Sequence, residues 1–220
     1  MAYLEGKNLV ASYGVVPILH ECSVQVEKGE LAVIVGPNGA GKSTVMRVLL
    51  GMLEATSGSV TLDGNDISML TTQDRISKGL AFVPQTKNVF PSMTVEENLQ
   101  MGGFIRKDDI SKTIAEVYEL FPILYDKRKQ LAEQLSGGQR QQVAFGRAMM
   151  TKPSVMLLDE PTAGVSPIVM DEIFSNILDV RNAGMAVLMV EQNAQQALNI
   201  ADKGFVLVSG RNEHTGTGKE

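Results

Sequence analysis

The fold of this chain is decided by the segment Leu31-Ala-Val-Ile-Val-Gly-Pro-Asn-Gly-Ala-Gly-Lys-Ser-Thr44. Its first five residues are all apolar, which is typical of a strand buried on both faces of a sheet. Three glycines in six residues follow, and a helical pattern then runs from Val45 to Leu53. The spacing Gly-x-x-x-x-Gly-Lys-Ser between a strand and a helix predicts a loop that binds phosphate groups.

This phosphate loop has the backbone and the side chains that a nucleoside triphosphate requires. Its residues are Gly36, Pro37, Asn38, Gly39, Ala40, Gly41, Lys42, Ser43 and Thr44. The glycines allow successive N–H groups to turn inward around an anion, and the helix that follows adds its positive N-terminal end. Lys42 can reach the β- and γ-phosphates, and the Ser43 hydroxyl can coordinate Mg²⁺. A glycine turn beside a surface lysine is the alternative, but it leaves the flanking strand and helix unexplained.

The length and composition of the chain fit one large domain, or one domain with an inserted subdomain. The chain has 220 residues, of which 44% are hydrophobic and 20% charged, as in ordinary globular proteins. The net charge of −5 gives no reason to expect a nucleic-acid partner. Cys22 is the single cysteine, so no internal disulfide can form, which fits a reducing cytosol. The longest apolar runs reach about a quarter of a membrane span, so if this protein works at a membrane, another protein crosses it.

Strand and helix patterns alternate along most of the chain, which predicts an α/β fold with a parallel sheet covered on both faces. Antiparallel strands are predicted at 4–13 and 22–26, and shorter strands at 60–62, 80–83, 155–158, 185–190 and 205–208. Helices are predicted near 170–178 and 194–201, and a long helical stretch at 94–150 looks like an insertion. The Gly-Thr-Gly tail after His214 looks loose.

The buried strand at 155–158 ends in the acidic pair Asp159-Glu160. Since ligands of open α/β sheets bind beyond the carboxyl ends of the strands, we expect both carboxylates to emerge beside the phosphate loop. Asp159 is then suited to hold Mg²⁺, directly or through water, and Glu160 to polarise a water for in-line attack on the γ-phosphate. An acidic pair at a strand end is often only a solvated turn, and the phosphate loop is what favours the functional interpretation here.

The segment Leu135-Ser-Gly-Gly-Gln139 predicts a second helix N-terminus that could bind an anion. Ser136 is a good N-cap, and Gly137 and Gly138 leave N–H groups free at the start of a helical pattern. An ordinary capped helix explains these residues equally well, and capping alone does not bring them near Lys42.

The chain resembles the ATP-binding cassette (ABC) ATPases in four segments that occur in this order: Gly36–Thr44, Gln85, Leu135–Gln139 and Leu157–Glu160. The resemblance covers essentially all of the chain, and the pentapeptide at 135–139 is close to diagnostic of that family. It implies a P-loop NTPase core with a mainly parallel sheet, an antiparallel β subdomain and a helical subdomain inserted at approximately residues 90–150, within a single domain of residues 1–220. It also implies ATP and Mg²⁺ as cofactors, with Ser43, Gln85 and Asp159 at the metal.

The resemblance assigns roles to residues that chemistry alone leaves open. ATP would be held between two cassettes arranged head to tail, by the phosphate loop of one and by Ser136, Gly137, Gly138 and Gln139 of the other. Tyr13 stands where the family stacks an aromatic ring on adenine, although a strand-end tyrosine with a solvated hydroxyl is the plain alternative. Gln85 stands where the family links Mg²⁺ and the attacking water to the membrane partner. The coupling helix of that partner would dock on the helical insertion, roughly residues 90–129.

Two positions depart from the family pattern. Most members carry Ser-Ala-Leu-Asp after Glu-Pro-Thr, whereas this chain has Ala163-Gly-Val-Ser166. Most members also carry a histidine at the γ-phosphate, where this chain has Gln192, whose neutral amide donates a hydrogen bond but cannot become a cation. Two interpretations therefore stay open. The chain either hydrolyses ATP with Gln85, Glu160 and Gln192 as catalytic residues, or it is a nucleotide-gated subunit that hydrolyses ATP weakly beside a sister ATPase.

The segments Glu160–Pro167 and Val190–Asn193 together resemble the second ATPase subunit of bacterial branched-chain amino-acid importers and of their urea and amide relatives. This implies an ATPase bound peripherally at the cytoplasmic face of the inner membrane. Its partners would be permease subunits, a sister ABC ATPase in a heterodimer (or a second copy in a homodimer) and, indirectly, a periplasmic binding protein, with no nucleic acid. A soluble cassette protein of translation or DNA repair is the remaining alternative, but such proteins usually have two cassettes or a long coiled-coil insertion. The transported substrate stays open, and we expect a closing C-terminal segment to be missing after Glu220.

Overall fold

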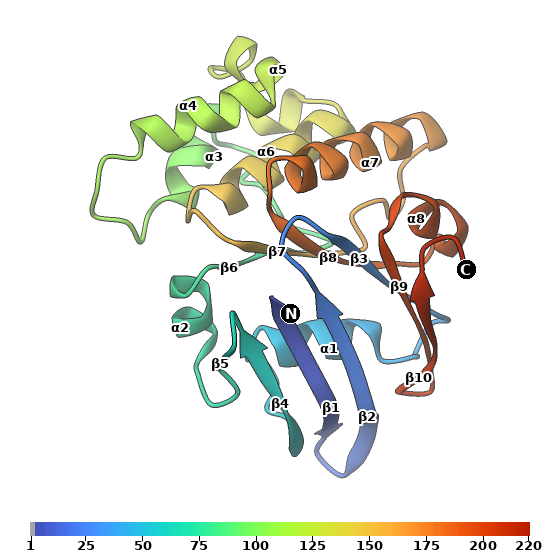
Figure 1. The fold of residues 1–220 in the computed structure, drawn as a ribbon. Coiled ribbons are helices and arrows are strands. Elements are labelled where there is room, and N and C mark those ends of the chain that lie inside the picture. Colours follow the sequence, from blue (N-terminus) through green and yellow to red (C-terminus); the bar gives the residue numbers. More distant parts are fainter. Residues whose placement is uncertain (1–2) are drawn as a thin grey trace.

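A computed structural model describes residues 3–220, and within them a six-stranded sheet forms the central layer (Figure 1). In spatial order its strands are β10 (Arg211–Thr217), β9 (Lys203–Val208), β3 (Leu31–Val35), β8 (Ala186–Glu191), β7 (Val155–Asp159) and β6 (Leu80–Val83). The strands from β9 to β6 run parallel, and β10 pairs with β9 in the antiparallel sense. β3 and β8 are buried along their whole length, as their apolar sequences predict. The predicted, mainly parallel sheet is therefore confirmed.

A smaller antiparallel sheet forms a second layer, in the lower part of Figure 1. In spatial order its strands are β2 (Val16–Val26), β1 (Leu4–Tyr13), β4 (Ser57–Leu62) and β5 (Asn65–Asp66). β1 matches the predicted strand, whereas β2 begins well before the predicted start at Cys22. Pro17 hides this first part of β2 in the sequence, because proline has no N–H group to donate to a neighbouring strand. An edge strand such as β2 tolerates proline.

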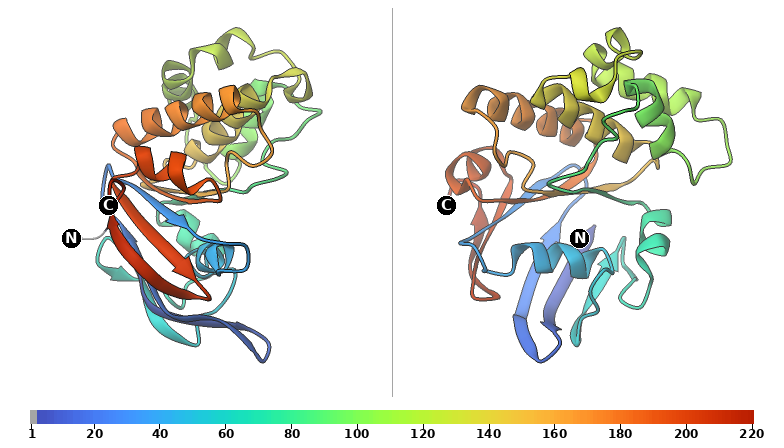
Figure 2. Two further views of the ribbon diagram at one scale, coloured as in Figure 1. Left: turned by 90° about the vertical axis from the view of Figure 1, so that its right-hand side faces the viewer. Right: turned by 180° about the vertical axis from the view of Figure 1, so that it is seen from behind.

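Helices cover both faces of the six-stranded sheet (Figure 2). They are α1 (Lys42–Leu49), α2 (Thr72–Ser77), α3 (Val95–Gly102), α4 (Ser111–Leu120), α5 (Pro122–Asp126), the short 3-10 helix Ala132–Gln134, α6 (Gly137–Met149), α7 (Pro167–Asn182) and α8 (Ala194–Ile200). α1 packs between the two sheets, in a core that includes Ile34 and Leu157. α6 and α7 pack on the opposite face, in a second core that includes Val33 and Met156. None of the helices in residues 3–220 combines the length and the apolar content that a membrane span needs.

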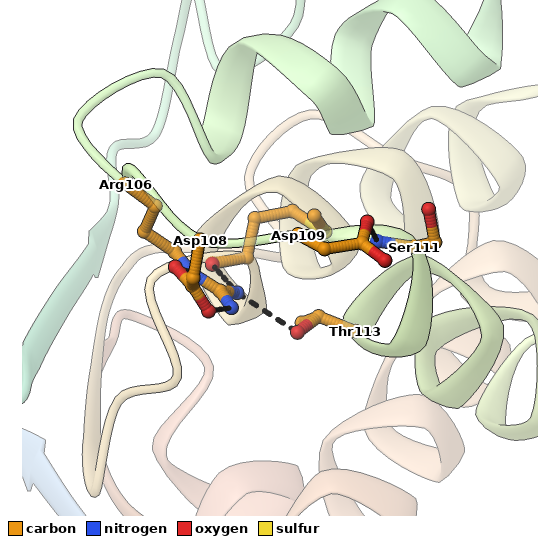
Figure 3. A network of polar contacts seen from close by, with 6 residues as sticks. Arg106, Asp108, Asp109, Ser111 and Thr113 are labelled. Atoms are coloured by element: carbon orange, nitrogen blue, oxygen red, sulfur yellow. Dashed lines mark hydrogen bonds and ion pairs between the residues drawn. The ribbon is translucent and has the colours of Figure 1, made fainter.

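The loop between α3 and α4 is anchored by Arg106, whose guanidinium joins several parts of the helical region (Figure 3). Its Nη1 donates to Thr113 Oγ1 in α4 at 2.8 Å and to the Met150 carbonyl oxygen after α6 at 2.9 Å. Its Nε donates to Asp108 Oδ1 at 2.9 Å, and the hydrogen bonds from Arg106 lower the pKa of the Asp108 carboxyl to about 2. α3 to α6 lie between β6 and β7 in the sequence, and Arg106 ties α4 to the end of α6. The division of the chain at residues 90–150 stays a prediction.

The prediction of a loose tail after His214 is wrong. β10 extends from Arg211 to Thr217 and pairs with β9, with Gly216 opposite Gly204 and Thr217 opposite Lys203. The side chains of β10 are mostly exposed, so backbone hydrogen bonds hold this strand in place. Hydrophobic periodicity detects strands by their buried side chains and therefore misses such a strand.

Cys22 lies in β2 and is fully buried in the core beside α1. Burial raises the pKa of the Cys22 thiol to about 12, and the thiolate is the form that reacts with thiol reagents. We therefore expect the folded chain to be inert toward Ellman's reagent at mildly alkaline pH, and the chain in denaturant to react with one equivalent. Absorbance measurements on folded and denatured samples check this, and rapid labelling of the folded chain would contradict the position of Cys22 in the core.

Candidate nucleotide-binding site

The phosphate loop connects β3 to α1 and forms most of the wall of a cavity of about 220 Å³. The lining residues are Ile18, Asn38, Gly39, Ala40, Gly41, Lys42, Ser43 and Thr44. Glycine is required at two loop positions. A Cβ atom on Gly36 would lie 2.2 Å from the Leu207 carbonyl oxygen, and one on Gly41, whose φ is +101°, would lie 2.8 Å from Leu19 Cδ2. The loop therefore packs against β9 and β2, and its own backbone faces the cavity.

Lys42 is the first residue of α1, and its side chain turns back over the loop. The Lys42 Nζ donates to the Gly36 carbonyl oxygen at 2.8 Å and to the Pro37 carbonyl oxygen at 3.2 Å, and the residue is only 5% exposed. A phosphate group bound in the loop would offer stronger, charge-assisted hydrogen bonds to the same ammonium group. Ser43 beside it is exposed and Thr44 is buried, so the Ser43 hydroxyl is the accessible one.

Asp159 ends β7 and lies in the electrostatic field of the phosphate-loop helix. Burial and the neighbouring Glu160 raise the pKa of the Asp159 carboxyl, while Arg47 and Lys42 act in the opposite direction. The Asp159 Oδ1 atom is buried and has no hydrogen-bond partner among residues 3–220. An unpaired, buried carboxylate oxygen is destabilising unless a cation or a water compensates it. Together with the exposed Ser43 hydroxyl of the loop, this carboxylate offers the oxygen ligands that a Mg²⁺ ion bound with phosphate groups would need.

Glu160 follows Asp159 and receives hydrogen bonds from two glutamines that lie far from it in the sequence. Gln192 Nε2 lies 3.0 Å and 2.9 Å from the two carboxylate oxygens of Glu160, and Gln85 Nε2 lies 3.0 Å from Oε2. The parallel strands β6, β7 and β8 are adjacent, and each of these residues comes just after one of them. The three residues that the sequence predicts as catalytic thus converge at the carboxyl ends of the parallel strands.

Tyr13 ends β1 and lies beside α1. Arg47 Nη1 donates to the Tyr13 hydroxyl oxygen at 3.2 Å, and the guanidinium carbon lies 5.9 Å from the ring centre. The tyrosine is 43% exposed. Its ring therefore has an open side near the phosphate-loop helix, which is compatible with stacking on a base.

The predicted N-cap of α6 is confirmed. Ser136 Oγ accepts from the Gln139 N–H at 3.2 Å, and Gln139 Oε1 accepts from the Ser136 N–H at 3.2 Å, which is a capping box. Gly138 is packed against α7, where an added Cβ atom would lie 2.4 Å from Glu172 Oε2. Since α6 and α1 cover opposite faces of the sheet, Ser136, Gly137, Gly138 and Gln139 are not part of the cavity at the phosphate loop.

Two buried polar residues at this site, Thr162 and Glu191, are not marked as functional by any motif or periodicity in the sequence. They are 3% and 2% exposed and hydrogen-bond to each other. Thr162 comes two residues after Glu160, and Glu191 comes directly before Gln192. Glu191 stands at the end of an apolar strand and therefore looks like the first residue of a loop. The parallel pairing of β7 with β8, which joins Asp159 to Val190, is the signal that would have brought the two together.

Comparison with known proteins identifies the architecture that carries this site. Residues 19–163 match the ABC transporter family. The chain belongs to this family. Among its relatives, the high-affinity branched-chain amino acid transport ATP-binding protein BraG of Pseudomonas aeruginosa is 46% identical over 90% of this chain and 86% of its own length. The probable branched-chain amino acid transport ATP-binding protein LivF of Archaeoglobus fulgidus is 40% identical over 97% of this chain and 91% of its own length.

A solved ABC cassette has the same fold. The crystal structure of the ADP conformation of MJ1267, an ATP-binding cassette of an ABC transporter, matches with a TM-score of 0.92 and 31% identity, over 100% of this chain and 92% of that one. This ABC ATPase therefore binds nucleotide and couples ATP hydrolysis to transport, and subunits of its kind work with membrane permease subunits. The predicted resemblance to ABC ATPases, and among them to those of branched-chain amino-acid transport, is confirmed.

Proposed function

We propose that this ABC ATPase powers an importer of branched-chain amino acids. The observation that carries the proposal is the convergence of Gln85, Glu160 and Gln192 at the carboxyl ends of the parallel strands. The phosphate loop follows the carboxyl end of β3 on the same side of the sheet. The likeness to BraG and LivF supports the substrate class. The subunit works at the cytoplasmic face of the inner membrane, bound to permease subunits and paired with a sister ATPase or a second copy. A periplasmic binding protein delivers the substrate to the permease.

In the proposed reaction, the phosphate loop holds the triphosphate and Lys42 contacts its β- and γ-phosphates. Ser43, Gln85 and Asp159 would hold Mg²⁺, which neutralises charge on the phosphate oxygens when it is bound. Glu160 accepts a proton from water as the oxygen of that water bonds to the γ-phosphorus. The bond from the γ-phosphorus to the bridging oxygen breaks, and ADP and phosphate leave. Gln192 orients the Glu160 carboxylate through its amide and stays neutral throughout.

A complete site needs two cassettes in this proposal. α1 and α6 cover opposite faces of one sheet, so the two helix N-termini of a single chain do not serve the same triphosphate. A head-to-tail partner would bring its own Ser136, Gly137, Gly138 and Gln139 to the phosphates, where the free N–H groups of a helix N-terminus favour an anion. Tyr13 would stack on the adenine of the same ATP.

In this proposal the helical subdomain spans approximately residues 90–150. The permease docks on a cavity of about 290 Å³ between this subdomain and the rest of the fold. The cavity wall includes Pro84 and Lys87 on either side of Gln85, and Met101 of α3. Met52 also lines the cavity and is 54% exposed, so it offers apolar surface to a partner helix. A movement of the partner at this wall would reach Gln85 and, through its hydrogen bond, Glu160.

Uptake by membrane vesicles tests the proposal. The subunit is expressed together with the transport genes next to its own, and vesicles loaded with ATP are supplied with the binding protein and labelled leucine. We expect ATP-dependent accumulation of leucine that isoleucine and valine suppress. Accumulation of urea or an amide instead, with no uptake of leucine, would refute the substrate class and support the urea and amide relatives.

Variants of Gln192 distinguish full from weak ATP hydrolysis at this site. Its amide donates to both oxygens of the Glu160 carboxylate, and a hydrogen bond to a charged group is worth about 1.5–3 kcal/mol, or about 10- to 100-fold in rate. We therefore expect Gln192→Ala to lower the kcat of ATP hydrolysis by about that factor, with little change in the affinity for ATP. Steady-state kinetics and an ATP titration check both values.

Gln192→His tests the alternative of a nucleotide-gated, weakly hydrolysing subunit. If the wild-type chain is such a subunit, histidine at this position should raise the rate above that of the wild type, because an imidazolium can neutralise phosphate charge. We expect no such rise. A clear gain in rate would favour the weak-site interpretation and would count against Gln192 as a catalytic residue.

A further inference from the structure

A second hydrogen-bonded contact lies beside the one between Gln192 and Glu160. Glu191 Oε1 accepts from the Thr162 N–H at 3.0 Å and from the Thr162 hydroxyl at 2.8 Å. Glu191 Oε2 accepts from the N–H of Gln192 at 3.2 Å. These three donors belong to the two segments that follow β7 and β8, so the carboxylate of Glu191 joins the ends of two neighbouring strands.

A carboxylate in this position has an energetic disadvantage. Glu191 is 2% exposed, and burial raises the pKa of its carboxyl although the hydrogen bonds from Thr162 and Gln192 act in the opposite direction. Its donors are neutral amide and hydroxyl groups, so they compensate the lost hydration only in part. An apolar residue would extend the buried strand β8 without this penalty. The penalty therefore indicates a role for the contact with Thr162.

The contact holds a strained backbone. Glu160 has a φ of +45°, a left-handed backbone conformation that residues other than glycine rarely adopt and that is strained. Its N–H donates to the Val190 carbonyl oxygen at 3.0 Å, and Thr162 is tied to Glu191 two residues further on. Three consecutive residues therefore hold Glu160 in place. Val190 accepts from its N–H, Glu191 fixes Thr162 two residues later, and Gln192 donates to its carboxylate.

We propose that Glu191 is a positioning residue for ATP hydrolysis, which acts through Thr162 to hold the backbone of Glu160 in its strained conformation. Released from Thr162, the segment after β7 can relax to an ordinary conformation, and the Glu160 carboxylate then turns away from Gln192. This inference rests on the proposed function, in which Glu160 is the base. The phosphate loop has its own contacts with β2 and β9, so binding of ATP does not depend on the contact.

Thr162→Val tests the contact with little change of shape, since it removes the hydroxyl donor and keeps the N–H. In the purified transporter complex we expect kcat to fall about 10-fold or more, while KM for ATP stays within about twofold. Thr162→Ser keeps the hydroxyl and should restore most of the rate. Glu191→Gln is a second variant, because its N–H₂ group cannot accept and its single oxygen can serve either the donors of Thr162 or the N–H of Gln192, but not both. We expect its kcat to fall as well. Thr113→Val is the matched control, since it removes a buried threonine hydroxyl far from the site.

Combining Thr162→Val with Glu160→Gln separates positioning from general destabilisation. If the contact acts only through the Glu160 carboxylate, Thr162→Val should not slow the small residual rate of Glu160→Gln any further. A full additional loss would overturn the inference, and so would a wild-type rate for Thr162→Val or an equal loss for Thr113→Val. An unchanged rate for Glu160→Gln alone would instead overturn the proposed function, so the two failures are distinguishable.

Discussion

Glu160→Gln should lower ATP hydrolysis by the transporter complex about 10²- to 10⁴-fold, which is the usual contribution of a positioned general base. The variant keeps the size of the side chain, and glutamine retains one oxygen that accepts from Gln85 or Gln192. It loses the ability to take a proton from the attacking water. Phosphate release under saturating ATP measures the rate, and a titration with MgATP measures the affinity, which we expect to stay close to that of the wild type.

A matched control for this variant is Glu119→Gln on α4, where the carboxylate is exposed and the helix packs on the face of the sheet opposite to α1. It changes the net charge by the same amount and should leave the rate unchanged. Undiminished hydrolysis by Glu160→Gln in the presence of its partners would remove Glu160 from the role of base. The convergence of the two glutamines on its carboxylate would then need another explanation.

Lys42→Ala should weaken the binding of ATP about 100-fold or more, because charge-assisted hydrogen bonds to two phosphates are lost together. The ammonium group of Lys42 is buried over the loop backbone, so no exposed lysine can take its place. Affinity for AMP should change much less, since Lys42 is expected to reach the β- and γ-phosphates. Equilibrium titrations with a fluorescent ATP analogue, with ATP and with AMP measure the three affinities.

Lys112→Ala, on the exposed face of α4, is the control for the loss of one positive charge. Its affinity for ATP should equal that of the wild type. If Lys42→Ala bound ATP as tightly as Lys112→Ala, the segment Gly36–Thr44 would not be the phosphate-binding loop.

The parts of the site that the sequence predicted are those with a local pattern. Strand, glycine-rich loop and helix occur within one short segment, and the acidic pair Asp159-Glu160 follows an apolar run directly. Backbone geometry fixes how such neighbours lie relative to one another, so their placement follows from the residues alone. The same holds for the capping box of Ser136 and Gln139.

The contact between Thr162 and Glu191 could not be predicted in this way, because it depends on which strands are neighbours. β7 and β8 are separated by α7 in the sequence, and only their pairing in the sheet brings the two segments together. An apolar run in a single sequence marks a strand but does not identify the strand that pairs with it. β10 was missed for a related reason, since its partner β9 supplies backbone hydrogen bonds and little apolar burial.

The three hydrogen bonds on the Glu160 carboxylate limit its access to the water that it would activate for ATP hydrolysis. A carboxylate has about four lone-pair positions, so few are left for an incoming water while both glutamines are engaged. Gln85 adjoins the wall of the cavity at which we expect the permease to bind, and its departure would free one of these positions. We therefore expect the transporter to hydrolyse ATP slowly in the absence of its transported substrate, and faster when substrate at the permease displaces Gln85.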